Sequence, residues 1–405
     1  MNIQTLKGFR DFLGADARKR HYVTETLRKV FASYGFEPLE TPTLEYEELL
    51  TGKYGDEGEK LMYKFADNGQ RNVAMRYDLT VPLSRVVAQY QNQLPMPFKR
   101  FQMQSVWRAD NPQKGRFREF MQCDADIVGT TTALSDAEVI AVIQKGLEAL
   151  GFTNTKILLN DRNIFEGLPM EAITVIDKLE KIGTDGVCEE LVEKNITKSK
   201  EEAYNLLQSI LEKKPTERLQ EIFACLKNAG ISQTSFTFSP TLARGLDYYT
   251  GLIFEIKSPD YPYGSLGGGG RYDNLVGMFA KKQIPAVGGS FGLDRIIEAM
   301  EALQLFPKNL AAGSAKVLVT IFNKALGEKS VEISSHLRTN NIATELWLDA
   351  ESKMDKQLKY ADSKHIPYVV ILGPEEVAEN KVTVKNLETR EQETVSLAQL
   401  LEILG

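Results

Sequence analysis

The chain has 405 residues but only three cysteines, and it contains no long apolar run and no excess of basic charge. Cys123, Cys188 and Cys225 lie far apart without a C-x-x-C partner, which argues against a disulfide framework and against a structural zinc site. No run of about 18 apolar residues occurs, and no secretory signal opens the chain. We therefore expect a cytoplasmic protein with no membrane partner.

The net charge of −6 predicts no broad basic surface. Any nucleic-acid partner would have to be met by local patches of Lys and Arg rather than by the field of the whole protein. The sequence also lacks G-x-x-x-x-G-K-[ST], which excludes a Walker phosphate-binding loop.

A chain of this length exceeds what one hydrophobic core usually organises, so two or three domains are expected. Its 42% hydrophobic and 26% charged residues are typical of a globular protein. We predict a first domain over residues 1–312, with a Lys- and Glu-rich helical insertion at about 166–230. A short linker at Gly313–Ala315 separates it from a second domain over 316–405.

Two segments of the first domain have apolar residues at helical spacing, namely 19–34, ended by Gly35, and 136–150, ended by Gly151. A third helix is expected over about 291–304. Short apolar segments broken by charges then predict antiparallel strands with one functional face. They run from Val73 to Val86 and from Pro97 to Val128, and a further strand pair with a turn is expected around Pro38 and Pro42.

In the second domain, three apolar segments alternate with two helical stretches. This order predicts a mostly parallel sheet. The segments are Val317–Phe322, Ile342–Leu348 and Tyr368–Leu372. The overall prediction is an α+β protein in which an antiparallel sheet domain is followed by an α/β domain.

The segment Ala243–Gly251 presents one arginine, one carboxylate and two phenols within six positions: Arg244, Asp247, Tyr248 and Tyr249. It opens a predicted strand, Leu252–Ile256, that the glycine run Gly267–Gly270 soon follows. A permanently charged guanidinium beside bare backbone suits a phosphate-bearing substrate. The alternative is an arginine in a surface ion pair beside two half-buried tyrosines.

A second cluster, Val106–Phe120, has the pattern of a basic hairpin with a Pro-Gly loop. Arg108 and Arg118 would project from paired strands while Lys114 and Arg116 lie at the tip, so that the four side chains could clamp a polyphosphate. A solvated charged hairpin is the alternative.

Polar residues at spacing two follow this hairpin, and Gln122, Asp124 and Asp126 therefore share one face of a strand. Asp78 and Thr80 are placed in the same way upstream, where they would receive an ammonium group. Finally, the segment Ala286–Arg295 predicts a strand that ends in glycines and a helix that carries Arg295 in its first turns, where a base or a phosphate can pack on the main chain.

Together these segments resemble the class II aminoacyl-tRNA synthetases, and specifically the histidyl-tRNA synthetase family. Tyr34–Pro38 with Thr41 and Pro42 resembles motif 1, which in that family builds a dimer interface. Arg108–Phe120 resembles motif 2 and Gly288–Arg295 resembles motif 3. Two further segments resemble histidine-specific signatures, and the resemblance covers essentially the whole chain, including an anticodon-binding domain at the C-terminus. These signatures are Arg244–Tyr249 and Gly268–Asp273.

The resemblance implies a role for each candidate residue. Asp78, Leu79 and Thr80 would bind histidine, with Asp78 and Thr80 on its α-ammonium group and Gln122 nearby. Asp126 and Tyr249 would hydrogen-bond the two imidazole nitrogens and Tyr248 would line the pocket. The arginines would bind ATP or the reacting groups: Arg108 and Arg244 at the α-phosphate, Arg116 at the outer phosphates, and Arg295 at the adenine and γ-phosphate.

The resemblance also implies the substrates ATP, L-histidine and tRNA(His), the ion Mg²⁺, and a homodimer. The ligands of Mg²⁺ are not indicated by the sequence. The alternative is a catalytically inactive paralogue such as the regulatory subunit of ATP phosphoribosyltransferase, which generally lacks the C-terminal domain and some of the arginines. Asp78 and Asp126 depart from the glutamate expected in many bacterial relatives, which shortens the reach of each side chain by one methylene.

Overall fold

A computed structural model describes residues 3–113, 115–243, 248–307, 310 and 315–405, with the backbone alone at 56 and 57. The chain divides into two compact units. The first contains Met1–Asp11 and Arg20–Leu305, and the second contains Phe12–Lys19 and Phe306–Gly405. No helix among the described residues is long and apolar enough to cross a membrane.

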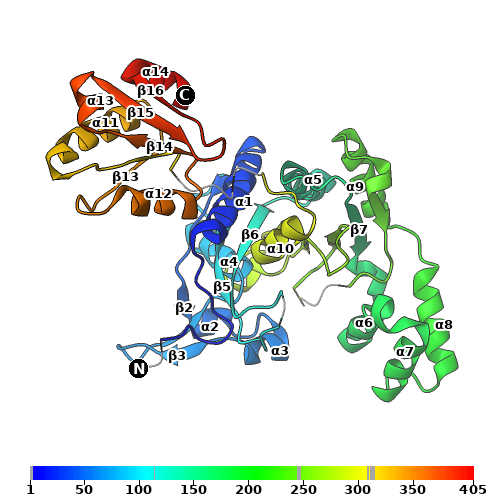
Figure 1. The fold of residues 1–405 in the computed structure, drawn as a ribbon. Coiled ribbons are helices and arrows are strands. Elements are labelled where there is room, and N and C mark those ends of the chain that lie inside the picture. Colours follow the sequence, from blue (N-terminus) through cyan, green and yellow to red (C-terminus); the bar gives the residue numbers. More distant parts are fainter. Residues whose placement is uncertain (1–2, 114, 244–247, 308–309, 311–314) are drawn as a thin grey trace. The chain divides into compact units, whose positions relative to one another are not determined.

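An eight-stranded sheet forms the centre of the first unit (Figure 1), in the order β1-β5-β6-β11-β10-β9-β7-β8. The pairs β1–β5 and β7–β8 are parallel and the other pairs are antiparallel, which confirms the predicted antiparallel sheet. The strands are β1 (Glu37–Pro38), β5 (Phe98–Trp107), β6 (Glu119–Val128), β7 (Lys156–Asp161), β8 (Phe236–Phe238), β9 (Leu252–Lys257), β10 (Gly267–Arg271) and β11 (Ala286–Gly292).

Two of the predicted helices pack on this sheet through their apolar stripes. Helix α1 (Gly14–Ser33) buries Phe31 against the rings of Phe101 and Phe291, with centroids 5.5 and 6.3 Å apart. Helix α5 (Ala133–Ala149) approaches α1 so closely that a Cβ at Gly146 of α5 would lie 2.9 Å from the side chain of Leu27 of α1. The third predicted helix is α10 (Leu293–Ala302).

The prediction for Val73–Val86 is wrong in its second half. Strand β4 (Asn72–Met75) is followed by helix α4 (Thr80–Tyr90). The carboxylate of Asp78 accepts hydrogen bonds from the backbone N–H groups of Thr80 at 3.2 Å and Val81 at 3.0 Å, which satisfies donors that a helix start leaves open. Asp78 and Thr80 therefore belong to a helix start and not to one face of a strand.

The predicted strand pair around Pro38 and Pro42 is also wrong. Strand β1 joins the large sheet beside β5, whereas β2 (Leu44–Tyr46) pairs with β4 in a separate small sheet. The order of that sheet is β2-β4-β3, with β3 at Lys64–Ala66. Two short helices, α2 (Glu47–Leu50) and α3 (Gly55–Lys60), connect β2 to β3.

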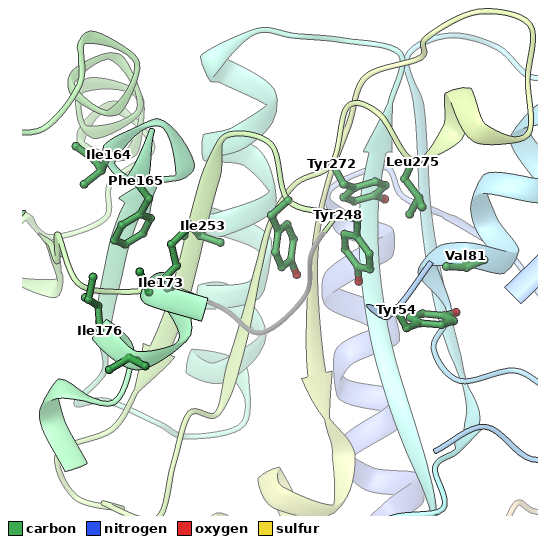
Figure 2. Close-up of a cluster of buried hydrophobic side chains, with 14 of the residues drawn as sticks. Tyr54, Val81, Ile164, Phe165, Ile173, Ile176, Tyr248, Ile253, Tyr272 and Leu275 are labelled. Carbon is green, nitrogen blue, oxygen red and sulfur yellow. The ribbon is translucent and has the colours of Figure 1, made fainter. Parts of the chain in front are cut away.

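Residues 166–230 are helical, as predicted, and contain no strand. Figure 2 shows part of the buried cluster that continues from these helices to the centre of the unit, with Ile173 and Ile176 at one end and Tyr54, Tyr248 and Tyr272 at the other. The helices are α6 (Met170–Ile176), α7 (Leu179–Glu193), α8 (Lys200–Leu211) and α9 (Glu217–Asn228).

The second unit contains a five-stranded sheet in the order β13-β12-β14-β15-β16. Its first three strands are parallel, as predicted, but two antiparallel strands follow, so the sheet is mixed and not mostly parallel. The strands are β12 (Val317–Val319), β13 (Thr344–Leu346), β14 (Tyr368–Ile371), β15 (Lys381–Asn386) and β16 (Gln392–Ser396). The helices are α11 (Gly327–Thr339), α12 (Met354–Ser363), α13 (Pro374–Ala378) and α14 (Leu397–Leu404).

Candidate active site

A cavity of about 470 Å³ lies in the first unit, over the strands β6, β10 and β11. It brings together nine of the residues that the sequence analysis selected. They are Asp78, Thr80, Arg108, Arg116, Gln122, Asp126, Tyr248, Tyr249 and Arg295. Leu79 does not line the cavity, because its side chain is fully buried in the core. Arg244, Asp247 and Lys114 lie outside the described residues.

At one end of the cavity, the carboxylate of Asp78 is surrounded by phenols. The Tyr54 hydroxyl donates to Asp78 Oδ1 at 2.9 Å and the Tyr248 hydroxyl donates to Oδ2 at 3.5 Å. Burial raises the pKa of Asp78, while its hydrogen bonds and Arg108 lower it. Burial also raises the pKa of Tyr54 and Tyr248 well above 10, so both phenols remain donors.

The second carboxylate, Asp126, is held by Arg100, which the sequence did not single out, and by Tyr272, which it placed only within the signature Gly268–Asp273. Arg100 Nη2 lies 2.8 Å from Asp126 Oδ2, and the Tyr272 hydroxyl donates to Oδ1. Arg100 is completely buried, and it stands opposite Asp126 in the register of β5 and β6. Polar residues at spacing two on β5, namely Arg100, Gln102 and Gln104, face Asp126, Asp124 and Gln122 in turn. The repeated spacing of polar residues in the sequence could have indicated that Arg100 lies on a polar face of its strand.

The glycines around this carboxylate have a packing role that differs from the one predicted. A Cβ at Gly288 would lie 1.8 Å from Asp126 Oδ1, and a Cβ at Gly269 would lie 1.9 Å from the carbonyl oxygen of Gly288. A Cβ at Gly270 would lie 2.7 Å from the ring of Tyr249. Glycine is therefore required at these three positions because other atoms of the protein already fill the space that a Cβ would occupy. Close approach of a ligand to the backbone is not needed to explain them.

The other end of the cavity carries guanidinium groups. Strands β5 and β6 form the predicted hairpin, in which Arg108 N–H donates to the Arg118 carbonyl at 2.9 Å. The Arg108 guanidinium lies 4.3 Å from the ring centroid of Tyr77 and 5.1 Å from that of Phe120. Arg116 is exposed, and Arg295 donates to the carbonyl of Ser265 at 3.3 Å.

Arg118 corrects the prediction of a four-sided clamp. Its side chain does not line the cavity but donates to the carbonyls of Asp110 at 3.0 Å and Lys7 at 3.3 Å. Arg118 therefore ties the base of the hairpin to the N-terminal segment. The cavity is thus lined by carboxylates and by guanidinium groups together, and Arg108 lies close enough to Asp78 for its charge to lower the pKa of that carboxylate. An amino acid and a polyphosphate would need both kinds of group.

Comparison with known proteins identifies this arrangement. Residues 8–296 match the family model described as histidyl-tRNA synthetase, and residues 316–405 match the model described as an anticodon binding domain. The chain belongs to the histidyl-tRNA synthetase family. It is 40% identical to the histidine–tRNA ligase of Cytophaga hutchinsonii, in an alignment that covers 98% of each chain.

Solved structures of histidyl-tRNA synthetases have the same fold. The chain superposes on the enzyme from Nostoc sp. PCC 7120 with a TM-score of 0.84 at 29% identity, covering 100% of this chain and 99% of that one. A Bacillus halodurans protein described as an ATP phosphoribosyltransferase regulatory subunit/histidyl-tRNA synthetase gives a TM-score of 0.72 at 24% identity, with 89% and 97% covered. At that identity the likeness shows the fold alone.

The signature Gly268–Asp273 of this synthetase-family chain contributes more to the scaffold than to the cavity. Arg271 makes a 2.5 Å ion pair with Asp136 at the start of α5 and a 2.9 Å ion pair with Asp273. Asp136 is completely buried and also pairs with Arg218 of α9 at 2.7 Å. In this segment, only Gly268, Gly269 and Tyr272 line the cavity.

Proposed function

We propose that the protein is a class II aminoacyl-tRNA synthetase that activates L-histidine with ATP and transfers the histidyl group to the 3′ end of tRNA(His). Membership of the family supports the activity. The single observation that carries the assignment of the site is that one cavity gathers carboxylates together with guanidinium groups.

At the carboxylate end, we infer that Asp78 and Thr80 bind the α-ammonium group, with Gln122 nearby, and that Leu79 contributes only through the backbone of this segment. Asp126 and Tyr249 would hydrogen-bond the imidazole nitrogens. A carboxylate accepts from the ring N–H, while a phenol donates to the ring nitrogen that lacks a proton. The contact of Asp126 with Arg100 supports its ionised form.

At the guanidinium end, Arg108 would bind the α-phosphate, Arg116 the outer phosphates and Arg295 the adenine and γ-phosphate. Arg244, outside the described residues, would act at the α-phosphate and the attacking carboxylate. The histidine carboxylate attacks the α-phosphorus, pyrophosphate leaves, and the terminal ribose hydroxyl of the tRNA then displaces AMP. No enzyme nucleophile is required, because positioning and charge stabilisation lower the barrier.

We expect Mg²⁺ to enter with ATP. No group of three His, Cys, Asp or Glu side chains suited to a metal occurs among the described residues. This fits Mg²⁺, which keeps several waters and is commonly held by substrate phosphates with one or two carboxylates. Asp110 and Asp294 are the carboxylates nearest to the guanidinium end that line the cavity, and Asp294 is already paired with Arg10 and Arg20. The ion would neutralise phosphate charge.

We further infer a catalytic domain over residues 1–312, an anticodon-binding domain over 316–405, and a cytoplasmic homodimer. The exposed side chains of Leu44, Tyr46 and Phe65 on the small sheet β2-β4-β3 support a protein interface there. The second domain is slightly acidic, with 11 Lys and Arg against 14 Asp and Glu from Ser314 onward. Anticodon bases would therefore be bound chiefly by polar and stacking contacts.

The test is ATP–pyrophosphate exchange with each amino acid in turn. Exchange that depends on histidine alone supports the proposal. The rival, a regulatory subunit of ATP phosphoribosyltransferase, predicts no exchange and stable binding to the phosphoribosyltransferase. The arginines at positions 108, 116 and 295 in the cavity disfavour that rival, since they have no use in a protein that does not bind ATP.

A further inference from the structure

Three polar side chains in the wall of the cavity form one continuous hydrogen-bonded chain. Gln122 Nε2 donates to Ser290 Oγ at 3.2 Å, and Ser290 Oγ donates to Asp124 Oδ1 at 2.5 Å. Ser290 stands opposite Asp124 in the antiparallel register of β11 and β6, and all three residues line the cavity. Asp124 shares a strand face with Gln122, but the family resemblance implies no role for it.

The direction of this chain follows from the protons available. Above neutral pH the Asp124 carboxylate is ionised and can only accept, so there the hydroxyl of Ser290 must give its single proton to Asp124. The Ser290 oxygen can then only accept from Gln122, which requires the amide to turn its NH₂ group toward Ser290. The reverse amide orientation would place two oxygen atoms face to face without a proton between them.

The amide orientation leaves Gln122 Oε1 as an acceptor without a donor. This oxygen is enclosed, and no hydrogen-bond partner occurs for it among the described residues. Buried acceptors in proteins are rarely left unpaired, so a bound molecule is the expected source of the donor. A phosphate or a carboxylate has no proton to give at neutral pH, whereas an ammonium group has three.

We propose that Asp124 and Ser290 are positioning residues that lock the amide of Gln122, so that its carbonyl oxygen accepts a hydrogen bond from the α-ammonium group of the amino-acid substrate. This inference rests on the proposed function, in which Asp126 and Tyr249 already use the imidazole nitrogens. The α-ammonium group is then the remaining donor of histidine.

As a consequence, the site distinguishes ligands that carry an α-ammonium group from ligands that lack one. Removing the serine hydroxyl frees the amide to rotate, and a rotated amide presents NH₂ groups to the ammonium group. Loss of one hydrogen bond to a charged group corresponds to a loss of affinity of about tenfold or more. A ligand that has the imidazole and the carboxylate but lacks the ammonium group makes no use of Gln122 Oε1.

The test measures dissociation constants by calorimetry at pH 8 for the full chain. Its probes are L-histidine and 3-(imidazol-4-yl)propanoate, which lacks the amino group. Ser290→Ala and Asp124→Ala each remove one link of the hydrogen-bonded chain, so each should weaken histidine binding about tenfold and leave binding of the propanoate within about twofold. Ser290→Thr retains the hydroxyl and should restore most of the histidine affinity, which a purely structural role of the serine would not predict.

A double-mutant cycle shows whether Ser290 acts through Gln122. In the Gln122→Ala background, Ser290→Ala should change histidine affinity less than about twofold, because the amide that it orients is gone. The proposal would be overturned if the losses of histidine affinity caused by Gln122→Ala and Ser290→Ala multiply in the double variant. It would also be overturned if Ser290→Ala weakens the binding of histidine and of the propanoate equally. Asp124→Ala, which removes the acceptor of the Ser290 hydroxyl, supplies the second route if Ser290→Ala does not fold.

Pyrophosphate exchange on the same preparations separates the two hypotheses. Histidine-dependent exchange together with independent mutational effects refutes the positioning roles and leaves the proposed function intact. Absence of exchange, with coupled effects on histidine binding, refutes the proposed function and supports the positioning roles. Failure of the unmodified chain to bind histidine refutes both.

Discussion

Replacing Asp124 with asparagine should stabilise the first unit in a manner that depends on pH. Asp124 is 3% exposed, and burial raises its pKa from 3.8 to about 7, with Arg100 opposing and Asp126 adding to that rise. The difference of about three pH units between the unfolded and folded pKa corresponds to about 4 kcal/mol. Asparagine keeps the shape and carries no charge, so it removes this destabilisation.

The sign follows from the two pKa values. Above pH 7, the carboxyl is ionised in both the folded and the unfolded protein, and the folded protein bears the full unfavourable burial of charge. Between pH 7 and pH 4, the folded protein binds a proton and the unfolded chain does not, so the destabilisation decreases by about 1.4 kcal/mol per pH unit. Asp124→Asn should therefore have its largest advantage at pH 8.5 and about half of that advantage at pH 5.5.

The assay is urea unfolding followed by the fluorescence of Trp107. The chain has two tryptophans, and Trp347 belongs to the second unit, so a Trp347→Phe background leaves a reporter for the first unit alone. The unfolding midpoint is compared between pH 5.5 and 8.5 for the two chains. Asp260→Asn, at an exposed aspartate, is the matched control. An advantage that is constant with pH, or absent at pH 8.5, would refute the reasoning.

Three further substitutions have definite expected outcomes. Arg244→Ala should lower the rate of histidyl-adenylate formation about 100-fold or more in stopped-flow measurements, and an unchanged rate would exclude its role at the α-phosphate. Gly288→Ala should abolish histidine binding in calorimetry while the chain stays folded, since a Cβ would lie 1.8 Å from Asp126 Oδ1; unchanged affinity would show that Asp126 can move without loss. Asp136→Ala should lower the free energy of unfolding by about 3–5 kcal/mol, because the buried Arg271 then keeps only the partly exposed Asp273 as an ion-pair partner, and a loss under about 1 kcal/mol in urea unfolding would contradict this.

The helices that the sequence predicted well are those whose burial is one-sided. Helix α1 buries Val23, Leu27, Val30 and Phe31 and leaves the rest partly or fully exposed, so its period of 3.6 is visible in the sequence. Helix α4 is different, because nearly every residue from Thr80 to Val87 is buried and the periodicity disappears. Its remaining signals were Asp78 before the first turn and Pro82 within it, since proline is tolerated there.

Strand pairing and the inner layer of the site needed the structure. Strands β15 and β16 show alternation that could have been recognised, with Val382 and Val384 between polar residues. The partner of β1 could not have been recognised, because a two-residue strand carries too little pattern to specify its neighbour. Arg100 and Ser290 reach Asp126 and Asp124 only through cross-strand register, a relation between segments that a single sequence does not contain.

The two ends of the cavity are built in different ways, and this division corresponds to two different recognition problems. Apart from Asp78, which lies at a helix start, the carboxylate end stands on three paired strands, where Arg100 faces Asp126 and Ser290 faces Asp124. Side chains fixed by register and enclosed by the core hold one geometry, which suits discrimination among amino acids that differ by a few atoms. The guanidinium end comes from chain connections: Arg108 just beyond β5 and Arg116 in the hairpin loop, whose side chain is 58% exposed. Long cationic side chains on connections can follow a phosphate as its bonds change, because they act by charge over a range of positions. Under the proposed function, the rigid sheet would select the amino acid, and the arginines would stabilise the charge that moves during its activation.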